Sequence, residues 1–311
     1  MPQPADNIQI SVVVCTYNRV ALLERVLDLL AAQAFPPDRY EVVVVDNNSD
    51  DGTRAMVERL AGRAKVAVRY LFEPRQGKSF ALNHGIRAAR GRWLAFTDDD
   101  VRVEPDWLER VYVRLETDRP DLMGGRVVPD WAGSWPDWFR PDYYGVVGVY
   151  DLGDAPIFLT LGRHRLPGGA NMAGRADTFR RFGPFREDLS DGRLHRSEDF
   201  ELFQRVLLQG GRVLYAPDVV VHHHVAPERL TRGYVRAWWV TQGRANARMR
   251  LDETETVPRI LGVPRWMFRQ AVTDGLSCGL QRLRGDANAA FFRETQLARF
   301  YGYVAERWRR A

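Results

Sequence analysis

Short, valine-rich apolar runs alternate with helical patterns over the first hundred residues, and this alternation is the feature that most restricts the fold. The apolar runs span 8–15, 41–45, 66–72 and 93–97, and the helical patterns between them span 22–30, 53–60 and 80–89. Alternation of this kind predicts an α/β fold with a parallel, doubly wound central sheet, in which each strand is buried on both faces.

The pattern changes in the second half of the chain. Residues 129–144 are rich in tryptophan and proline, which predicts an ordered loop lined with aromatic side chains rather than a helix. A helix over 197–208 and a strand pair around 213–215 and 219–222 are expected next. Helical patterns then dominate to the end, over 234–249, 266–283 and 288–309. We therefore expect an α/β domain over 1–225 and a helical region over 226–311.

Charge is distributed unevenly between these two regions. The chain has 45 Lys and Arg against 40 Asp and Glu, a net charge of +5. Residues 226–311 contain 16 arginines and 8 acidic residues, a net charge of +8, so residues 1–225 carry −3. Net positive charge suggests nucleic acid as a partner, but no known binding motif accompanies it. We do not expect nucleic acid to be the partner.

Other classes are excluded by simple counts. Two cysteines, Cys15 and Cys278, are too few for a disulfide framework or a cysteine metal site. Residues 1–7 lack the basic and apolar regions of a secretory signal. No apolar run approaches the roughly 18 residues that span a bilayer. We expect a cytoplasmic protein, with peripheral contact to a membrane as one alternative.

Three of the expected strands end in polar clusters, at residues 16–19, 46–52 and 98–100. Each cluster alone could be a turn or a helix cap, because Asn, Asp and Ser suit both. The carboxyl ends of parallel strands, however, lie at one edge of a sheet, where α/β folds bind their ligands. Three successive polar strand ends therefore indicate a binding site.

The third cluster is the run Asp98-Asp99-Asp100. Adjacent carboxylates repel one another and are costly to bury without a cation. Their hard oxygens suit Mg²⁺ or Mn²⁺, and such ions often bridge a protein to a diphosphate. Asp98 and Asp100 could share one face, with Asp99 turned the other way. The alternative is a solvated acidic turn.

These motifs, taken in order, resemble the family 2 glycosyltransferases, which have the nucleotide-diphospho-sugar-binding GT-A fold. The resemblance covers about residues 8–225. It rests on residues 12–18, 43–53, 77–83, 91–96 and 98–100. One departure is the Cys15-Thr16 pair, which stands where the family often has a proline. The resemblance implies a nucleotide-sugar half over about 8–128 and an acceptor half over about 129–225.

The resemblance also implies roles for the strand-end residues. Thr16, Tyr17 and Asn18 would line the base and ribose pocket, and Asp46 would hydrogen-bond the base. Lys78 would meet phosphate, or else be a solvated residue at a helix start. The aspartate run would complete the donor site: Asp98 would contact ribose or the metal, Asp99 would lie with the nucleotide-sugar residues, and Asp100 would bind the metal directly.

The second half would supply the acceptor side. Asp199 would be the general base for the acceptor hydroxyl, with Glu198 as the second choice; both also suit a first helical turn, which is the structural alternative. Gly169, Ala170 and Asn171 would approach the acceptor, or else form a plain turn. Among the three histidines at 222–224, we favour His222 as a third metal ligand, because it directly follows the apolar run 219–221.

The resemblance thus implies an inverting hexosyltransferase that uses Mn²⁺ or Mg²⁺ and a nucleotide-diphosphate sugar, with UDP the expected nucleotide. The acceptor could be a glycan, a lipid-linked sugar, a natural product or a peptide. Alternatives are a sugar nucleotidyltransferase or a non-catalytic carbohydrate-binding scaffold. The arginine-rich helical region could pack on the body, contact a membrane surface or form a homodimer.

Overall fold

Four parallel strands form the N-terminal half of the central sheet in this computed structural model, which describes residues 7–190, 197–249 and 257–310. Strand β1 lies between β2 and β4, and β3 pairs with β2. Their bounds are β1 (Ile10–Thr16), β2 (Tyr40–Asp46), β3 (Ala67–Phe72) and β4 (Trp93–Asp98). The valines of β1 and β2 are buried on both faces, as continuous apolar strands require. The predicted α/β fold is confirmed.

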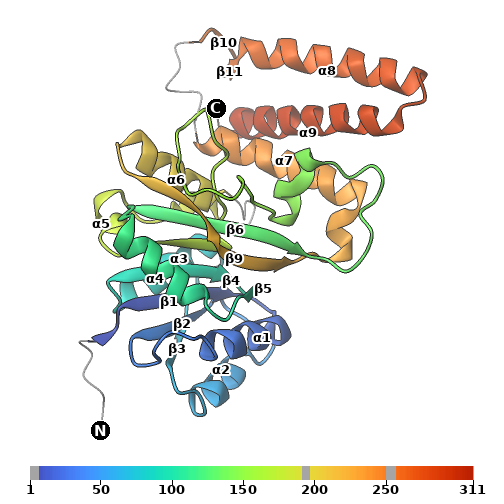
Figure 1. Ribbon diagram of the computed structural model, residues 1–311. Helices are drawn as coiled ribbons and strands as arrows, with labels where there is room; N and C mark the ends of the chain where they lie inside the picture. Colours follow the sequence, from blue (N-terminus) through green and yellow to red (C-terminus); the bar gives the residue numbers. More distant parts are fainter. Residues whose placement is uncertain (1–6, 191–196, 250–256, 311) are drawn as a thin grey trace. The chain divides into compact units, whose positions relative to one another are not determined.

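Helices cover both faces of this half-sheet (Figure 1). The chain runs outward from β1 to β3 through α1 (Val20–Ala31) and α2 (Thr53–Ala61), then returns to β4 through α3 (Lys78–Ala88). Parallel crossovers are right-handed, so reversing the direction puts α3 on the opposite face from α1 and α2. The start of α3 therefore lies near the carboxyl ends of β1 and β4.

Beyond β4 the sheet becomes mixed, in the order β3-β2-β1-β4-β8-β6-β9-β5, with β7 paired to β9. The added strands are β5 (Val101–Val103), β6 (Leu122–Asp130), β7 (Ile157–Phe158), β8 (Asn171–Arg175) and β9 (Val213–His224). The strand pair expected around 213–222 is instead the single strand β9. Its Pro217 lies at an irregularity where the register with β6 shifts between Gly125 and Arg126, which lets the strand continue past a proline.

The remaining helices of the sheet region are α4 (Trp107–Thr117), α5 (Thr178–Arg181) and α6 (Glu198–Leu208), with the short 3₁₀ turn η3 (Glu187–Leu189). Two further 3₁₀ turns, η2 (Pro141–Val147) and η4 (Pro227–Leu230), belong mostly to the helical unit described next. Helix α4 buries Trp107, Leu108, Val111 and Leu115, which recur at helical spacing. Helix α6 corresponds to the helix expected over 197–208.

The chain divides into two compact units. The first consists of the residues up to 131 together with 147–225, and holds the sheet. The second consists of 132–146 and 226–311, so the aromatic segment assigned above to the acceptor half packs within the helical unit. There Tyr143 and Val146 are buried with Val235 and Phe291.

Three long helices make up most of the second unit: α7 (Arg232–Met249), α8 (Arg265–Leu283) and α9 (Ala287–Arg310). A small hairpin of β10 (Arg259–Ile260) and β11 (Val263–Pro264) precedes α8. Helix α9 packs against both α7 and α8 (Figure 1). Gly243 and Gly302 let the backbones of α7 and α9 come close, because a β-carbon at either would overlap the opposite main chain.

The predicted helical C-terminal region is confirmed. Long as they are, α7, α8 and α9 are not apolar enough to cross a membrane, and neither is any other helix among residues 7–190, 197–249 and 257–310.

Candidate active site

The polar clusters that follow β1, β2 and β4 lie side by side at one edge of the sheet. The register pairs Thr16 with Asp46 and Cys15 with Asp98, so the three strands end within one residue of each other. Parallel strands in register bring their carboxyl ends together, which is the geometry that the sequence predicts for a ligand site.

The loop after β1 is fastened to the loop after β2. Asn18 adopts a left-handed conformation, with φ 50°, which asparagine tolerates better than most residues. Its backbone N–H donates to Ser49 Oγ at 2.9 Å, and its side-chain oxygen accepts from the Asp50 N–H at 2.9 Å. The neighbouring Tyr17 is exposed. Asn18 therefore shapes the loop, and the Tyr17 ring is the accessible group.

Asp46 is buried at the end of β2, and both of its carboxylate oxygens have partners. The Tyr70 hydroxyl donates to one at 2.8 Å, and the Ser49 backbone N–H donates to the other at 2.9 Å. Burial and the Asp46 charge raise the pKa of Tyr70, which keeps the hydroxyl a donor. Asp46 is thus held rigidly by hydrogen bonds to both of its carboxylate oxygens.

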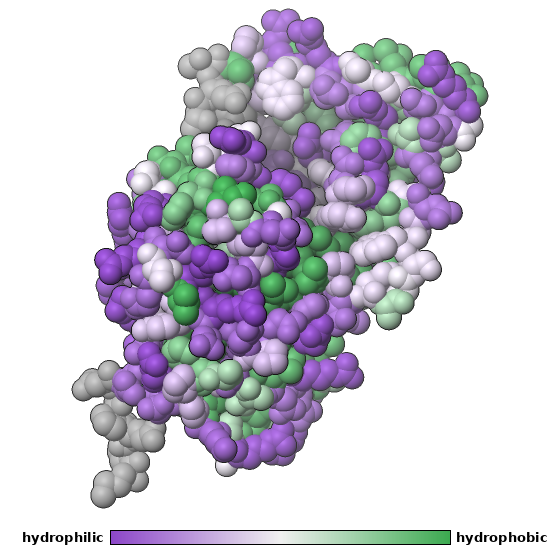
Figure 2. Space-filling view, viewed as in Figure 1, coloured by the Kyte–Doolittle hydropathy of each residue, from purple (hydrophilic) through white to green (hydrophobic). Residues whose placement is uncertain are grey.

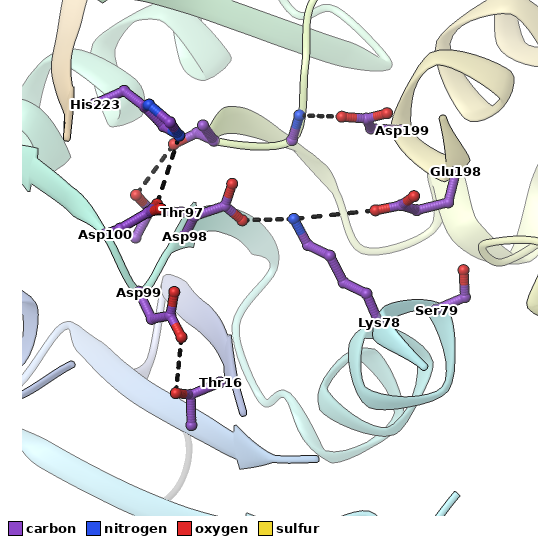
Figure 3. Close-up of polar contacts among 12 residues, drawn as sticks. Thr16, Lys78, Ser79, Thr97, Asp98, Asp99, Asp100, Glu198, Asp199 and His223 are labelled. Atoms are coloured by element: carbon purple, nitrogen blue, oxygen red, sulfur yellow. Dashed lines mark hydrogen bonds and ion pairs between the residues drawn. The ribbon is translucent and has the colours of Figure 1, made fainter. Parts of the chain in front are cut away.

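Asp99 points away from its two neighbours and into the β1 side of the site (Figure 3). It accepts from the Thr16 hydroxyl at 2.8 Å and from Arg19 at 2.9 Å. Burial raises the pKa of Asp99 to about 6, although Arg19 acts in the opposite direction. Arg19 also donates to Asp100 at 3.1 Å, so it neutralises part of the acidic run. This role of Arg19 is not predicted from the sequence.

Asp98, Asp100 and His223 form a cluster whose ligand atoms all lie within 4.8 Å of one another. His223 Nε2 is 3.5 Å from Asp100 Oδ1, and Gly148, with φ 77°, lets the backbone pass against the imidazole ring. Two carboxylate oxygens and an imidazole nitrogen are a donor set that fits Mn²⁺ or Mg²⁺. The residues present therefore fit the divalent cation that the sequence predicts.

His222 was predicted as the third metal ligand, but the histidine that lies beside Asp98 and Asp100 is His223. His222 lies outside the cluster, with its Nε2 2.5 Å from Glu104 Oε1. Side chains alternate along β9, and Val219, Val221 and His223 are the buried set. Following the face of the two valines, rather than taking the first histidine after them, would have selected His223.

Lys78 stands between the two groups of acidic side chains (Figure 3). Its Nζ is 2.6 Å from Asp98 Oδ1 and 3.9 Å from Glu198 Oε1. Burial alone would lower the pKa of Lys78, but Asp98, Glu198 and Asp199 together raise it, so the ammonium stays charged. For Asp98, burial would raise the pKa, but the Lys78 charge lowers it below its usual value.

The acidic pair at the start of α6 faces this lysine. Asp199 Oδ2 accepts from the Gly169 backbone N–H at 2.5 Å, and its Oδ1 accepts from the Phe200 N–H at 2.7 Å, which fixes the carboxylate. Glu198 is buried, and burial with the neighbouring Asp199 raises its pKa to about 7. Within the part of the chain that the structure describes, Glu198 Oε2 has no hydrogen-bond partner.

The three acceptor-side residues divide between the site and the fold. Gly169 contacts Asp199 directly, and the Ala170 carbonyl accepts from the Thr97 hydroxyl at 3.1 Å. Asn171 is buried, and its amide NH₂ donates to the carbonyls of Arg126 and Val219, while its oxygen accepts from the Trp107 indole. Asn171 therefore joins β8 to β6, β9 and α4 instead of facing a ligand.

One pocket brings Asp98 and Lys78 together with Glu198 and Asp199. Its full lining is Cys15, Lys78, Leu82, Phe96, Thr97, Asp98, Gly169, Met172, Phe185, Glu198 and Asp199. Burial raises the pKa of the Cys15 thiol, so this side chain contributes no thiolate.

Known proteins resemble the chain in sequence and in fold. Succinoglycan biosynthesis protein ExoM of Rhizobium meliloti is 27% identical over 247 residues, 79% of this chain and 76% of ExoM. The mannosyltransferase PcManGT from Pyrobaculum calidifontis, solved with GDP-Man and Mn²⁺, superposes with a TM-score of 0.66 at 22% identity, covering 97% of this chain and 88% of that one. TarS 1–349 of S. aureus, solved with UDP, gives a TM-score of 0.57 at 19% identity, covering 97% and 92%.

The family assignment rests on a part of the chain that contains most of the residues of the site. Residues 11–187, more than half of the chain, match the family described as Glycosyl transferase family 2. This range contains all three strand-end clusters, Lys78 and the glycine segment that contacts Asp199. The chain therefore belongs to glycosyl transferase family 2 and is a glycosyltransferase.

Proposed function

We propose that this enzyme transfers a sugar from a nucleotide-diphosphate donor, with UDP the expected nucleotide, to an acceptor hydroxyl by a metal-assisted, inverting single displacement. One observation carries the proposal: the pocket is lined by Asp98 and by the Glu198–Asp199 pair, with the charged Lys78 Nζ between them (Figure 3). A cation-binding and phosphate-binding side opposite a carboxylate base is what such a displacement requires.

On the donor side, Asp98, Asp100 and His223 would hold the divalent cation. When bound, the cation would offset the negative charge that develops on the departing diphosphate. Lys78 supports the same role, because its charged Nζ is 2.6 Å from Asp98 and can pair with a phosphate oxygen entering the pocket. The UDP complex of TarS and the GDP-Man complex of PcManGT are consistent with a nucleotide donor.

On the acceptor side, we assign the general base to Asp199. Its carboxylate would take the hydroxyl proton while the acceptor oxygen bonds to the anomeric carbon and the bond from that carbon to the diphosphate oxygen breaks. Attack from the side opposite the leaving group inverts the anomeric centre. The two backbone N–H groups that bind Asp199 orient it, which supports this choice over Glu198.

Calorimetry and a transfer assay test the proposal together. We expect UDP to bind the full chain with Mn²⁺ and only weakly after chelation. Asp199→Asn should lower transfer by about 10²–10⁴-fold, the usual contribution of a general base, with UDP affinity unchanged within a few fold. Glu198→Gln is the matched control, because it changes the adjacent carboxyl of the same helix.

Each alternative has its own outcome. Loss of transfer in Glu198→Gln but not in Asp199→Asn would move the base to Glu198. UDP binding that ignores Mn²⁺ would contradict the metal-assisted donor site. Metal-dependent binding with neither donor hydrolysis nor transfer to a panel of acceptors would favour a carbohydrate-binding scaffold.

A further inference from the structure

Helix α8 exposes an apolar stripe on the side opposite its contact with α9. Val272, Leu276, Leu280 and Leu283 follow one another at helical spacing, and Leu276 and Leu283 are 73% and 88% exposed. On the opposite side, Cys278 is buried and lies against the Ala290 carbonyl of α9. The apolar stripe of α8 therefore contributes little to the helical unit's own core.

The hairpin before α8 adds further exposed apolar side chains. Leu261, at the tip between β10 and β11, is 74% exposed, and Ile260 and Trp266 are exposed beside it in the sequence. Trp308 of α9 is also exposed, and its indole N–H donates to the Leu261 carbonyl at 3.2 Å. We call the stripe of α8 together with Ile260, Leu261, Trp266 and Trp308 the α8 surface.

Arginines accompany this apolar surface. Arg265 and Arg269 lie eleven and seven residues before Leu276, so they continue the same stripe toward the start of the helix. Arg282 and Arg284 flank its other end and are exposed, and Arg282 is paired with Glu294 of α9. Asp274 is the one acidic residue of α8; it is buried and paired with Arg293 at 2.9 Å. Green apolar side chains lie among purple ones over the α8 end of the unit (Figure 2).

We propose that the α8 surface docks the enzyme on an anionic lipid bilayer surface. Leucines and tryptophans would enter the boundary between headgroups and acyl chains, and the arginines would pair with anionic headgroups. Arginine suits this position because its apolar stem can pack beside the leucines while the guanidinium reaches the phosphates. Since α8 displays no exposed acid, the positive charge near its two ends complements a negative surface.

The charge pattern favours a bilayer over a second copy of the chain. A two-fold contact would bring the same surface of each copy together, so Arg265 and Arg269 of α8 and the adjacent Arg284 would meet the same arginines of the other copy with no acid of α8 to offset them. Like charges at an interface oppose association, whereas anionic headgroups attract all of them. This inference concerns attachment and holds whichever donor or acceptor the active site uses.

Vesicle co-sedimentation of the full chain tests the proposal. We expect binding to vesicles of phosphatidylcholine with added phosphatidylglycerol, and much weaker binding to phosphatidylcholine alone. Each arginine near an anionic surface contributes about fivefold to affinity, so Arg265→Glu with Arg269→Glu should weaken binding by about 25-fold or more. Leu276→Asp with Leu280→Asp should weaken it by about tenfold or more, because the insertion is lost.

Matched controls place the same changes elsewhere. Arg25→Glu on α1 and Val113→Asp on α4 alter exposed residues outside the α8 surface and should leave vesicle binding within about twofold. Unchanged melting temperature and UDP binding would show that the α8 variants fold. Equal binding to neutral and anionic vesicles, or full binding by the leucine variant, would overturn the proposal. So would a dimer that Leu276→Asp dissociates in a chain that binds no vesicles.

Discussion

Lys78 is one of only two lysines among 45 basic residues. Its ammonium group lies among the acidic side chains of the pocket. An arginine presents a planar fork, whereas an ammonium is a compact point charge that can exchange partners in a small space. Lys78 bonds Asp98 in the structure and lies 3.9 Å from Glu198. We infer that it balances the acidic side chains of the pocket before a diphosphate arrives.

The histidine assignment leads to a direct prediction at the residue scale. His223→Ala should weaken Mn²⁺-dependent UDP binding by about tenfold or more, because it removes a nitrogen ligand from the Asp98–Asp100 cluster. His222→Ala, its neighbour on the opposite face of β9, should change that affinity by less than about twofold. Titration calorimetry with Mn²⁺ and UDP measures both; the reverse order would restore His222 as the ligand.

Glu198 predicts how stability depends on pH. Its pKa rises from 4.5 to about 7 on folding, chiefly through burial, so the folded chain holds this proton more tightly than the unfolded chain does. The stability due to this carboxyl is fully present below pH 4.5 and is lost as pH rises through about 7.

Denaturant titrations of metal-free protein test this. The free energy of unfolding of the wild type, relative to Glu198→Gln, should fall between pH 4.5 and about 7. A difference that stays constant across this range would show that Glu198 titrates normally.

At the scale of elements, a buried ion pair joins α7 to α9. Arg248 Nε is 2.7 Å from Glu306 Oε1, and both side chains are almost fully buried. Glu306→Gln should lower the free energy of unfolding by about 3–5 kcal/mol, because it leaves the Arg248 charge without its carboxylate partner. Chemical denaturation measures the change.

Glu294→Gln, the same substitution elsewhere on α9, is the control. Glu294 pairs with Arg236 and Arg282, whose side chains are largely exposed, so the cost should stay below about 1 kcal/mol. Equal costs for the two variants would mean that burial does not set the energy of the α7–α9 ion pair.

The elements best predicted from sequence are those whose pattern is local. The runs that became β1, β2 and β4 are apolar on both faces, so neither register nor neighbours had to be known. Strand β8 begins at Asn171, whose amide binds β6, β9 and α4; its burial depends on partners 45 to 64 residues away along the chain. The spacing of apolar residues within the segment therefore does not identify it as a strand.

Some residues of the candidate site could be predicted from local sequence, and others could not. Asp98, Asp100, Lys78 and Asp199 could be selected because they lie in motifs that follow one another in the order typical of the family. Arg19 could not, because its role depends on two carboxylates about 80 residues away. His223 could have been predicted, because it lies on the same face of the strand as Val219 and Val221. Choosing it required giving the alternation of side chains along the strand more weight than the position of the first histidine after the apolar run.

For the whole molecule, the net charge of +5 is the sum of two unlike parts. The region up to residue 225 carries −3 and holds the acidic pocket; residues 226–311 carry +8 and include the arginines of the α8 surface. Opposite charge on the two parts agrees with the different partners that we propose for them: a metal-bound diphosphate for one and an anionic surface for the other.

The division into two compact units predicts calorimetric behaviour. UDP with Mn²⁺ binds only the folded first unit in our proposal, so saturation at about 100 times the dissociation constant should stabilise that unit by about 2.7 kcal/mol. Differential scanning calorimetry should then show one transition rising in temperature and a second that stays in place. Two transitions that rise together would mean that the units unfold cooperatively.

The two thiols described above also make this enzyme convenient for spectroscopy. Cys15 stays protonated because burial raises its pKa, and Cys278 is enclosed between α8 and α9. Neither should react readily with a maleimide dye. A fluorophore could therefore be attached to one engineered surface cysteine of the otherwise native chain, so that its arrival at a lipid surface could be followed in real time.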